Sequence, residues 1–236
     1  MRGYEVVRHA GAGLLHALSE LGAARMAPPR DARAAAHRLA GALATIARAH
    51  DLSVEIRGEV PRGCALVVAN HVSYLDPLAI LPICPAAPLA KAGVARWPIV
   101  GNIGGALGVV FVERETAAGR IRALRRVHAL LAAGVSVLNF PEGTTNRDEI
   151  GGFYRGTFGI AQRLGVTVVP VAVRYRDPAL AWCGGATFVP HYASVAARTR
   201  VDVTVTFCSP MPPRTGERPE TFAARARQAI AHVVTR

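Results

Sequence analysis

The chain has 236 residues, of which 51% are hydrophobic, so it can form one domain with a core and is not an extensively disordered chain. Its formal net charge of +12 favours an anionic partner: nucleic acid, an acidic membrane or a phosphorylated small molecule. Aromatic residues make up only 6% of the chain and no stripe of arginines and aromatics occurs, which argues against nucleic acid.

Residues 1–50 are predicted to form two helices. Apolar residues recur at helical intervals in the first of these, namely Val6, Leu14, Leu15, Leu18 and Leu21. Pro28 and Pro29 interrupt the pattern, and Asp31 is suited to cap a second helix that also carries Arg33, Arg38 and Arg48. Basic amphipathic helices of this kind can lie on an anionic membrane surface. The alternative is that they only cover the core of the domain.

From residue 51 to residue 236, short runs typical of strands alternate with helical stretches. The strands are expected at Leu52–Arg57, Ala65–Ala69, Leu89–Lys91, Val109–Glu113, Val135–Phe140, Val168–Arg174 and Val201–Phe207. Helices are expected at Thr116–Ala133, Phe158–Leu164 and Pro219–Val234. This alternation predicts an α/β fold with a mostly parallel central sheet covered by helices, preceded by the N-terminal helix pair. Chemistry is then expected in loops that follow the carboxyl ends of strands.

The first such loop is Asn70–Pro77, which directly follows an apolar run. His71 and Asp76 are close enough in sequence for the carboxylate to orient the imidazole, and such a pair can take a proton from a hydroxyl. The alternatives are a structural hydrogen bond and a helix cap by Asp76 before Pro77. Ser73 is a weak candidate for a hydrolase nucleophile, because it lies two residues from His71 and the chain lacks a G-x-S-x-G elbow.

The second loop begins at Glu113 and Arg114, after the run Gly108–Val112. Arg114 is suited to bind a phosphate at the strand end. The alternative is a surface ion pair between these two neighbours.

The third loop is Phe140–Arg147, again directly after an apolar strand. Glu142, Gly143 and Thr144 suit a polar ligand-binding loop, although the same residues also favour an ordinary β-turn. A fourth feature is Pro170, which indicates either a bulge beside the site or an edge strand.

These motifs together resemble the glycerolipid acyltransferase family, the lysophosphatidic acid (1-acyl-sn-glycerol-3-phosphate) acyltransferases. That family is marked by N-H-x-x-x-x-D, a block ending in phenylalanine-x-x-arginine, F-P-E-G and a V-P-V block, and this sequence has all of them in that order between Leu52 and Phe207. The resemblance implies that residues 51–236 are an acyltransferase domain. It also implies that His71 is the general base and that Asp76 orients it.

The resemblance also implies how the acceptor is bound. Arg114 would bind its phosphate or other acidic head group, and Glu142, Gly143 and Thr144 would shape the acceptor site. Lys91, the only lysine in the chain, falls where the family often places a phosphate-binding lysine. Pro170 would have a structural or acyl-site role.

Two features leave the acceptor open. Thr145 stands where the family commonly has arginine, and Arg147 is the nearby residue that could reach the same anion. The segment Tyr175–His191 resembles a bacterial branch that includes enzymes acylating lyso-ornithine lipid. The expected reaction is therefore acylation of 1-acylglycerol-3-phosphate to give phosphatidate, with lyso-ornithine lipid as the alternative acceptor and a thioesterase or hydrolase as a further alternative.

The expected acyl donor is acyl-CoA or acyl carrier protein, with no metal and no other cofactor. A thioester already has a good leaving group, so the acceptor hydroxyl needs only deprotonation and alignment. No run reaches the about 18 to 20 apolar residues that cross a bilayer. Peripheral attachment to the cytoplasmic face of the cell membrane is expected.

Overall fold

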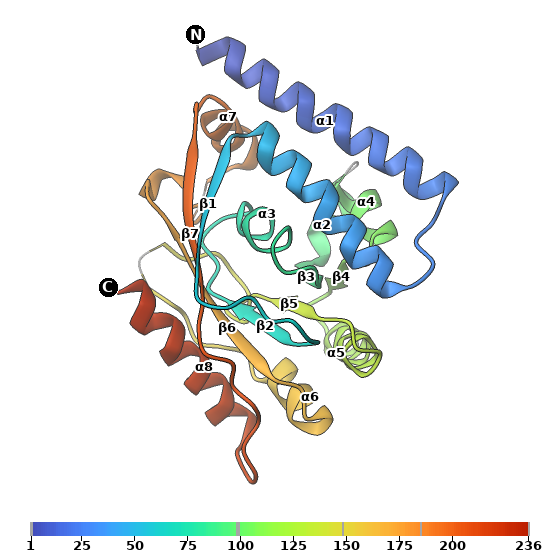
Figure 1. Cartoon of the computed structure of the whole chain (residues 1–236), viewed down its shortest axis with the longest axis vertical. Coiled ribbons are helices and arrows are strands. Elements are labelled where there is room, and N and C mark those ends of the chain that lie inside the picture. Colours follow the sequence, from blue (N-terminus) through green and yellow to red (C-terminus); the bar gives the residue numbers. More distant parts are fainter. Residues whose placement is uncertain (1, 98–99, 148, 185, 236) are drawn as a thin grey trace.

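A computed structural model describes residues 2–97, 100–147, 149–184 and 186–235 (Figure 1). Its centre is a seven-stranded sheet in the order β1-β7-β6-β2-β5-β3-β4. The strands are β1 (Leu52–Arg57), β2 (Leu66–Ala69), β3 (Ala87–Lys91), β4 (Val110–Val112), β5 (Val137–Asn139), β6 (Val168–Tyr175) and β7 (Val201–Phe207). Every neighbouring pair is parallel except β6 and β7. The predicted α/β fold with a mostly parallel sheet is confirmed.

Helices cover both faces of this sheet. They are α1 (Arg2–Met26), α2 (Ala32–Ala49), α3 (Asp76–Ile80), α4 (Val100–Ala106), α5 (Ala117–Ala132), α6 (Gly156–Leu164), α7 (Phe188–Ala196) and α8 (Pro219–Val234), with short 3₁₀ helices at Ala92–Arg96 and Pro178–Leu180. Figure 1 shows α5, α6 and α8 on one side of the sheet and α2 and α3 on the other.

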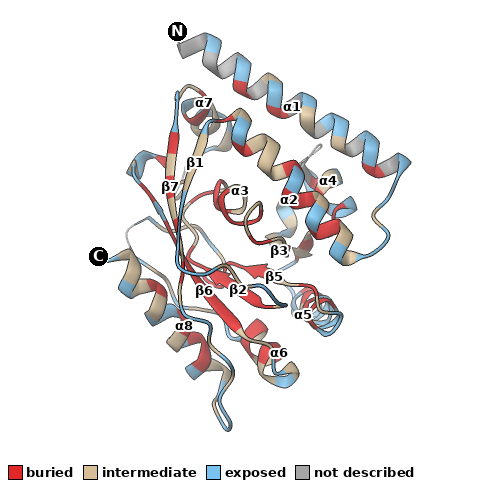
Figure 2. Cartoon of the chain, in the orientation of Figure 1, coloured by how far each residue is buried: buried red, intermediate tan, exposed pale blue. Residues whose placement is uncertain are grey.

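Each face of the sheet has its own core because successive strand residues point to opposite sides. Val67 and Ala69 of β2 pack in the cluster that also holds Ile80 of α3, whereas Leu66 and Val68 pack in the cluster with Phe158 of α6. Figure 2 shows the central strands β2, β5 and β6 buried almost throughout. Burial on both faces explains why these strands are apolar runs without alternation.

The two predicted N-terminal helices are present. Asp31 caps α2 through a hydrogen bond from the Ala34 N–H to its Oδ1 at 2.7 Å, as expected. Helix α1 contacts α2, α4 and α7, so it lies over other helices and not on the sheet (Figure 1). The side chains of Val6, Leu14 and Leu21 are outside the described part of the chain. No helix among the described residues is both long and apolar enough to cross a bilayer.

Helices α4 and α7 were not predicted from the sequence. The α4 segment contains three glycines, which have low helix propensity, so local preference does not favour a helix there. Glycine is required at position 101 because a Cβ there would lie 2.1 Å from the carbonyl oxygen of Ala95. The edge-strand interpretation of Pro170 is wrong, since β6 lies between β7 and β2.

Candidate active site

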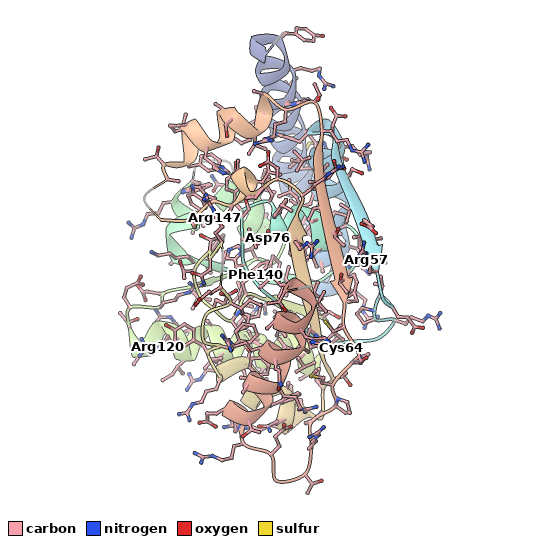
Figure 3. All side chains as sticks on the ribbon, turned by 90° about the vertical axis from the view of Figure 1, so that its left-hand side faces the viewer. Arg57, Cys64, Asp76, Arg120, Phe140 and Arg147 are labelled. Atoms are coloured by element: carbon pink, nitrogen blue, oxygen red, sulfur yellow. The ribbon has the colours of Figure 1, made fainter. Side chains whose placement is uncertain are left out.

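The loops that follow β2, β5 and β4 meet at the carboxyl edge of the sheet. This edge is where ligands bind in open parallel sheets. The loop after β2 carries His71 and Asp76, the loop after β5 carries Glu142 and Gly143, and the segment after β4 carries Arg114. Figure 3 labels Asp76 and Phe140 beside one another in the middle of the molecule.

Asn70 fixes the direction in which the chain leaves β2. Its side-chain Oδ1 accepts a hydrogen bond from the Val173 N–H at 2.8 Å, and its Nδ2 donates to the Val173 carbonyl at 3.0 Å. The backbone pairing of β2 with β6 ends at Ala69 and Val171. The amide of Asn70 therefore continues the ladder in place of the backbone, which leaves the backbone of His71 free to turn into the site.

His71 and Asp76 form a hydrogen-bonded pair. The distance from His71 Nδ1 to Asp76 Oδ2 is 2.7 Å. The same Oδ2 accepts hydrogen bonds from the N–H groups of Val72 at 2.8 Å and Ser73 at 3.0 Å. Asp76 is completely buried, so these donors stabilise a carboxylate that has lost its water. The helix-cap interpretation is wrong, because Leu75 is the N-cap of α3 and Asp76 bonds back into the preceding turn.

The imidazole of His71 is held in one orientation and remains accessible. Its ring stacks on Phe140 with a centroid distance of 4.1 Å, and its side chain is 21% exposed. Because Nδ1–H donates to Asp76, the neutral ring presents the unprotonated Nε2 to the site. A base with this arrangement can accept a proton from a hydroxyl group.

Glu142 connects the β5 loop to His71. Its Oε1 accepts a hydrogen bond from the backbone N–H of His71 at 2.9 Å. Its Oε2 accepts from Asn146 Nδ2 at 2.6 Å and from the Gly151 N–H at 2.7 Å. In return, the Asn146 N–H donates to the His71 carbonyl at 2.7 Å. The buried carboxylate is thus occupied by the protein itself, and it shapes the site by fixing two loops.

Gly143 and Arg114 meet at the next position of this loop. Gly143 has φ +76°, and a Cβ there would lie 2.9 Å from Tyr154 and 3.2 Å from Arg114 Nη1, so both backbone angle and space require glycine. Arg114 Nη1 donates to the Gly143 carbonyl. Burial lowers the pKa of Arg114, whose guanidinium is partly removed from water.

The expected alternative of an ion pair between Glu113 and Arg114 is wrong. Glu113 instead pairs with Arg122 of α5, with a distance of 2.8 Å between Oε2 and Nη2. Arg114 turns toward the β5 loop, where it donates to the Gly143 carbonyl. The predicted turn at Phe140–Gly143 is present, with a hydrogen bond from the Gly143 N–H to the Phe140 carbonyl at 3.0 Å.

The other predicted site residues lie further out. Lys91 is exposed at the carboxyl end of β3, two strands from β2, and Thr144 is exposed on the β5 loop. Thr145 turns inward, where its hydroxyl donates to the Trp182 carbonyl. Arg147 lines a cavity of about 190 Å³ together with Asn70 and Glu142, and Arg114 is not among the lining residues.

Sequence reasoning missed two contributors to this site. Asn146 holds both Glu142 and the His71 carbonyl, and Tyr175 donates a hydrogen bond to Asp76 Oδ1 at 2.8 Å. Asn146 belongs to the polar loop that the motif marks, so its position was a usable signal. The predicted strand Val168–Arg174 leaves Tyr175 out, whereas Tyr175 is the last residue of β6, and only the pairing of β6 with β2 brings it to Asp76.

Comparison with known proteins gives matches over most of the chain. A family model described as Acyltransferase matches residues 51–174. A lyso-ornithine lipid O-acyltransferase of Pseudomonas aeruginosa is 32% identical over 194 residues, which cover 80% of this chain and 74% of the relative. A 1-acyl-sn-glycerol-3-phosphate acyltransferase of Neisseria gonorrhoeae is 34% identical over 163 residues, which cover 67% of this chain and 60% of the relative.

The fold also matches a solved structure. The crystal structure of a 1-acyl-sn-glycerophosphate acyltransferase from Thermotoga maritima aligns with a TM-score of 0.71, at 22% sequence identity, over 100% of this chain and 97% of that one. At this identity the match supports the fold, including the N-terminal helices, and does not identify the substrate.

Proposed function

This chain belongs to the acyltransferase family, as the motifs predicted, and on that premise we propose that it transfers an acyl chain from a thioester to the free hydroxyl of a lysophospholipid. The acceptor proposed from the motifs is 1-acylglycerol-3-phosphate, which would give phosphatidate. The observation that carries the proposal is the pair of His71 and Asp76, with 2.7 Å between Nδ1 and Oδ2, at the carboxyl edge of the sheet.

The proposed reaction needs one base. His71 Nε2 takes the proton of the acceptor hydroxyl as its oxygen attacks the thioester carbonyl, and Asp76 stabilises the imidazolium that forms. The tetrahedral intermediate collapses with cleavage of the carbon–sulfur bond. The leaving thiolate then takes the proton from His71, so the products are an ester and a free thiol and the enzyme returns to its starting state. Neither a metal nor an acyl-enzyme is needed in this sequence of steps.

Arg114 and Lys91 are the proposed contacts for an anionic acceptor. Lys91 ends β3 and Arg114 follows β4, two strands whose carboxyl ends lie at the same edge as His71, and Arg114 is already directed at the β5 loop. Guanidinium groups bind phosphate through charge-assisted hydrogen bonds. Glu142 and Gly143 support this part of the site by fixing the loop, with Thr144 exposed on it.

A second acceptor, lyso-ornithine lipid, is favoured by two observations. Thr145, at the position where an arginine is common, donates to the Trp182 carbonyl and supplies no positive charge. The Pseudomonas aeruginosa relative, which aligns over 80% of this chain, is named a lyso-ornithine lipid O-acyltransferase. This acceptor would use the same base and change only the head-group contacts.

The proposed donor is acyl-CoA or acyl carrier protein, and the proposed location is the cytoplasmic face of the cell membrane, as a peripheral protein. The net charge of +12 would attract an acidic carrier protein, the phosphates of CoA and an anionic membrane alike. Helix α1 would contribute apolar contacts, because Tyr4, Leu15, Leu18 and Met26 are exposed on it.

The experiment that tests this proposal is thiol release from acyl-CoA and from acyl carrier protein by the purified chain. Each donor is assayed with lysophosphatidate, with lyso-ornithine lipid and without acceptor, and the lipid product is identified by mass. Release that requires lysophosphatidate supports phosphatidate synthesis, and release that requires lyso-ornithine lipid supports the second acceptor. Release of equal rate without acceptor would show a thioesterase and overturn the proposal.

The variant His71→Ala checks the base in the same assay. We expect transfer to fall at least about a hundredfold, the usual contribution of a general base. His128→Ala, at an exposed position of α5, is the matched control and should keep full activity. Transfer by a folded His71→Ala protein at the rate of the control would sink the mechanism.

The variant Arg114→Ala separates acceptor binding from chemistry. We expect the KM for lysophosphatidate to rise about tenfold or more because a charge-assisted contact is lost, with a smaller effect on kcat. Arg122→Ala, which removes an exposed arginine paired with Glu113, is the control and should leave KM unchanged. Equal KM values for the two variants would remove Arg114 from the acceptor site.

A further inference from the structure

Tyr175 is the last residue of β6, and its side chain reaches the turn that carries His71 and Asp76. Its hydroxyl donates to Asp76 Oδ1 at 2.8 Å, and the ring is buried, with 8% of the residue exposed. Val173, two residues earlier, pairs through its backbone with the side chain of Asn70. Strand β6 therefore holds both ends of the loop that follows β2.

The two oxygens of Asp76 have different partners. Oδ2 accepts from the His71 ring and from the N–H groups of Val72 and Ser73, all within the same turn. Oδ1 accepts from Tyr175, which lies 99 residues away in the sequence. Because Asp76 is fully buried, water would not replace the hydrogen bond from Tyr175 if this donor were lost.

The Tyr175 hydroxyl is a lasting donor. Burial, followed by the negative charge of Asp76, raises the pKa of Tyr175 well above its ordinary value. The phenol therefore stays protonated at every pH at which the enzyme would work. Its proton is directed at Oδ1 of the Asp76 carboxylate. A neutral donor of this kind draws negative charge away from the carboxylate without cancelling it.

We propose that Tyr175 is a positioning residue for acyl transfer, which fixes the rotation of the Asp76 carboxylate and moderates the basicity of His71. The inference rests on the proposed function, since it assigns His71 as the base. Tyr175 acts through Asp76 and touches no substrate. With the hydrogen bond present, Oδ2 faces Nδ1 and part of the carboxylate charge is held by the phenol.

The direction in which the loss of the Tyr175 hydroxyl changes His71 can be predicted. The carboxylate then holds more charge at Oδ2, so it stabilises the imidazolium better and the pKa of His71 rises. The base is consequently protonated, and inactive, up to a higher pH. Glu142 is bonded to the His71 N–H, and Tyr74, which is bonded to His191 at 3.1 Å, interacts with Tyr175. The other ionisable groups that line the cavity beside Tyr175 are Arg147, Glu149, Arg174 and Asp177. The substitution Tyr175→Phe replaces none of these side chains.

The test compares Tyr175→Phe with the control Tyr192→Phe. Tyr192 is partly buried, and its hydroxyl lies 2.9 Å from His50 Nε2, away from Asp76. For Tyr175→Phe we expect kcat to fall about five- to tenfold, the effect of one lost hydrogen bond, with both KM values unchanged. The acidic limb of the kcat–pH profile should move to higher pH. The control should show neither change.

Titration of the His71 ring by NMR measures the same coupling without turnover. The His71 pKa should rise in Tyr175→Phe and fall when Tyr175 is replaced by 3-fluorotyrosine, whose more acidic phenol is a stronger donor of nearly the same size. The fluorinated protein also covers the case in which Tyr175→Phe does not fold. An unchanged His71 titration in folded variants would overturn the inference. A shifted titration in a protein that transfers no acyl group to any acceptor would sustain the coupling of Tyr175 to His71 through Asp76, and would overturn both the proposed reaction and the role of Tyr175 in acyl transfer.

Discussion

Glu142 shows that a residue of a functional motif can act entirely through other protein groups. Its carboxylate receives hydrogen bonds from His71, Asn146 and Gly151, which come from two loops. Asp76 is used in the same way inside its own turn. Two buried carboxylates therefore organise the backbone around a single accessible ring, that of His71, and each is satisfied by donors that the fold supplies.

The variant Glu142→Gln should destabilise the protein and slow transfer. A glutamine presents an NH₂ group toward one of the donors that now meet a carboxylate oxygen, so at least one buried hydrogen bond is lost. We expect the free energy of unfolding to fall by about 2 kcal/mol. Chemical denaturation measures this, with Glu149→Gln on the exposed part of the same loop as the control. Equal midpoints for the two variants would mean that the Glu142 network contributes little.

Helix α1 combines packing on the protein with an exposed apolar face. It contacts α2, α4 and α7, and it is joined to the domain through His9, whose Nδ1 lies 2.8 Å from the Ala196 carbonyl. Leu15 is 70% exposed and Leu18 is 48% exposed on the same helix. Helix α1 thus packs on other helices and leaves apolar side chains exposed, and membrane attachment through this face stays a prediction.

The double variant Leu15→Asp/Leu18→Asp should weaken membrane attachment without unfolding the protein. Losing two apolar contacts and adding two charges should lower binding to anionic vesicles by about tenfold or more. Sedimentation with vesicles measures this. Ile121→Asp is the control, because Ile121 is 50% exposed on α5 and offers the same kind of change on another helix. Equal losses in both proteins would remove the special role of α1.

The whole molecule carries a large excess of arginine, and many of these residues are exposed. Some are neutralised in pairs such as Arg57 with Glu55 and Arg200 with Asp202, but the net charge remains +12. Pairs of this exposed kind contribute little to stability. The excess charge would instead act at longer range, on the proposed anionic membrane or acidic donor, and salt would screen this action.

Vesicle binding should therefore depend on ionic strength. Between 0.1 M and 0.5 M salt the screening length shortens from about 10 Å to less than half of that, so affinity for anionic vesicles should fall at least about tenfold. Affinity for neutral vesicles, which rests on apolar contacts, should change little. Measuring both compositions at both salt concentrations checks this, and a salt-independent affinity for anionic vesicles would contradict a role for the net charge.

The sequence determined the alternation of strands and helices, the two N-terminal helices with the Asp31 cap, and the positions of His71, Asp76, Arg114 and Glu142 after strands. These features are encoded locally, in apolar runs, capping residues and turn chemistry. Helix α4 escaped prediction because its three glycines give it little local preference for a helix, and α7 was also not predicted. Only the tertiary structure decided the partners of the carboxylates, because the order of the strands places β5 on one side of β2 and β6 on the other. Glu142 thereby reaches the backbone of His71 and Tyr175 reaches Asp76, contacts between residues that no spacing along the chain connects.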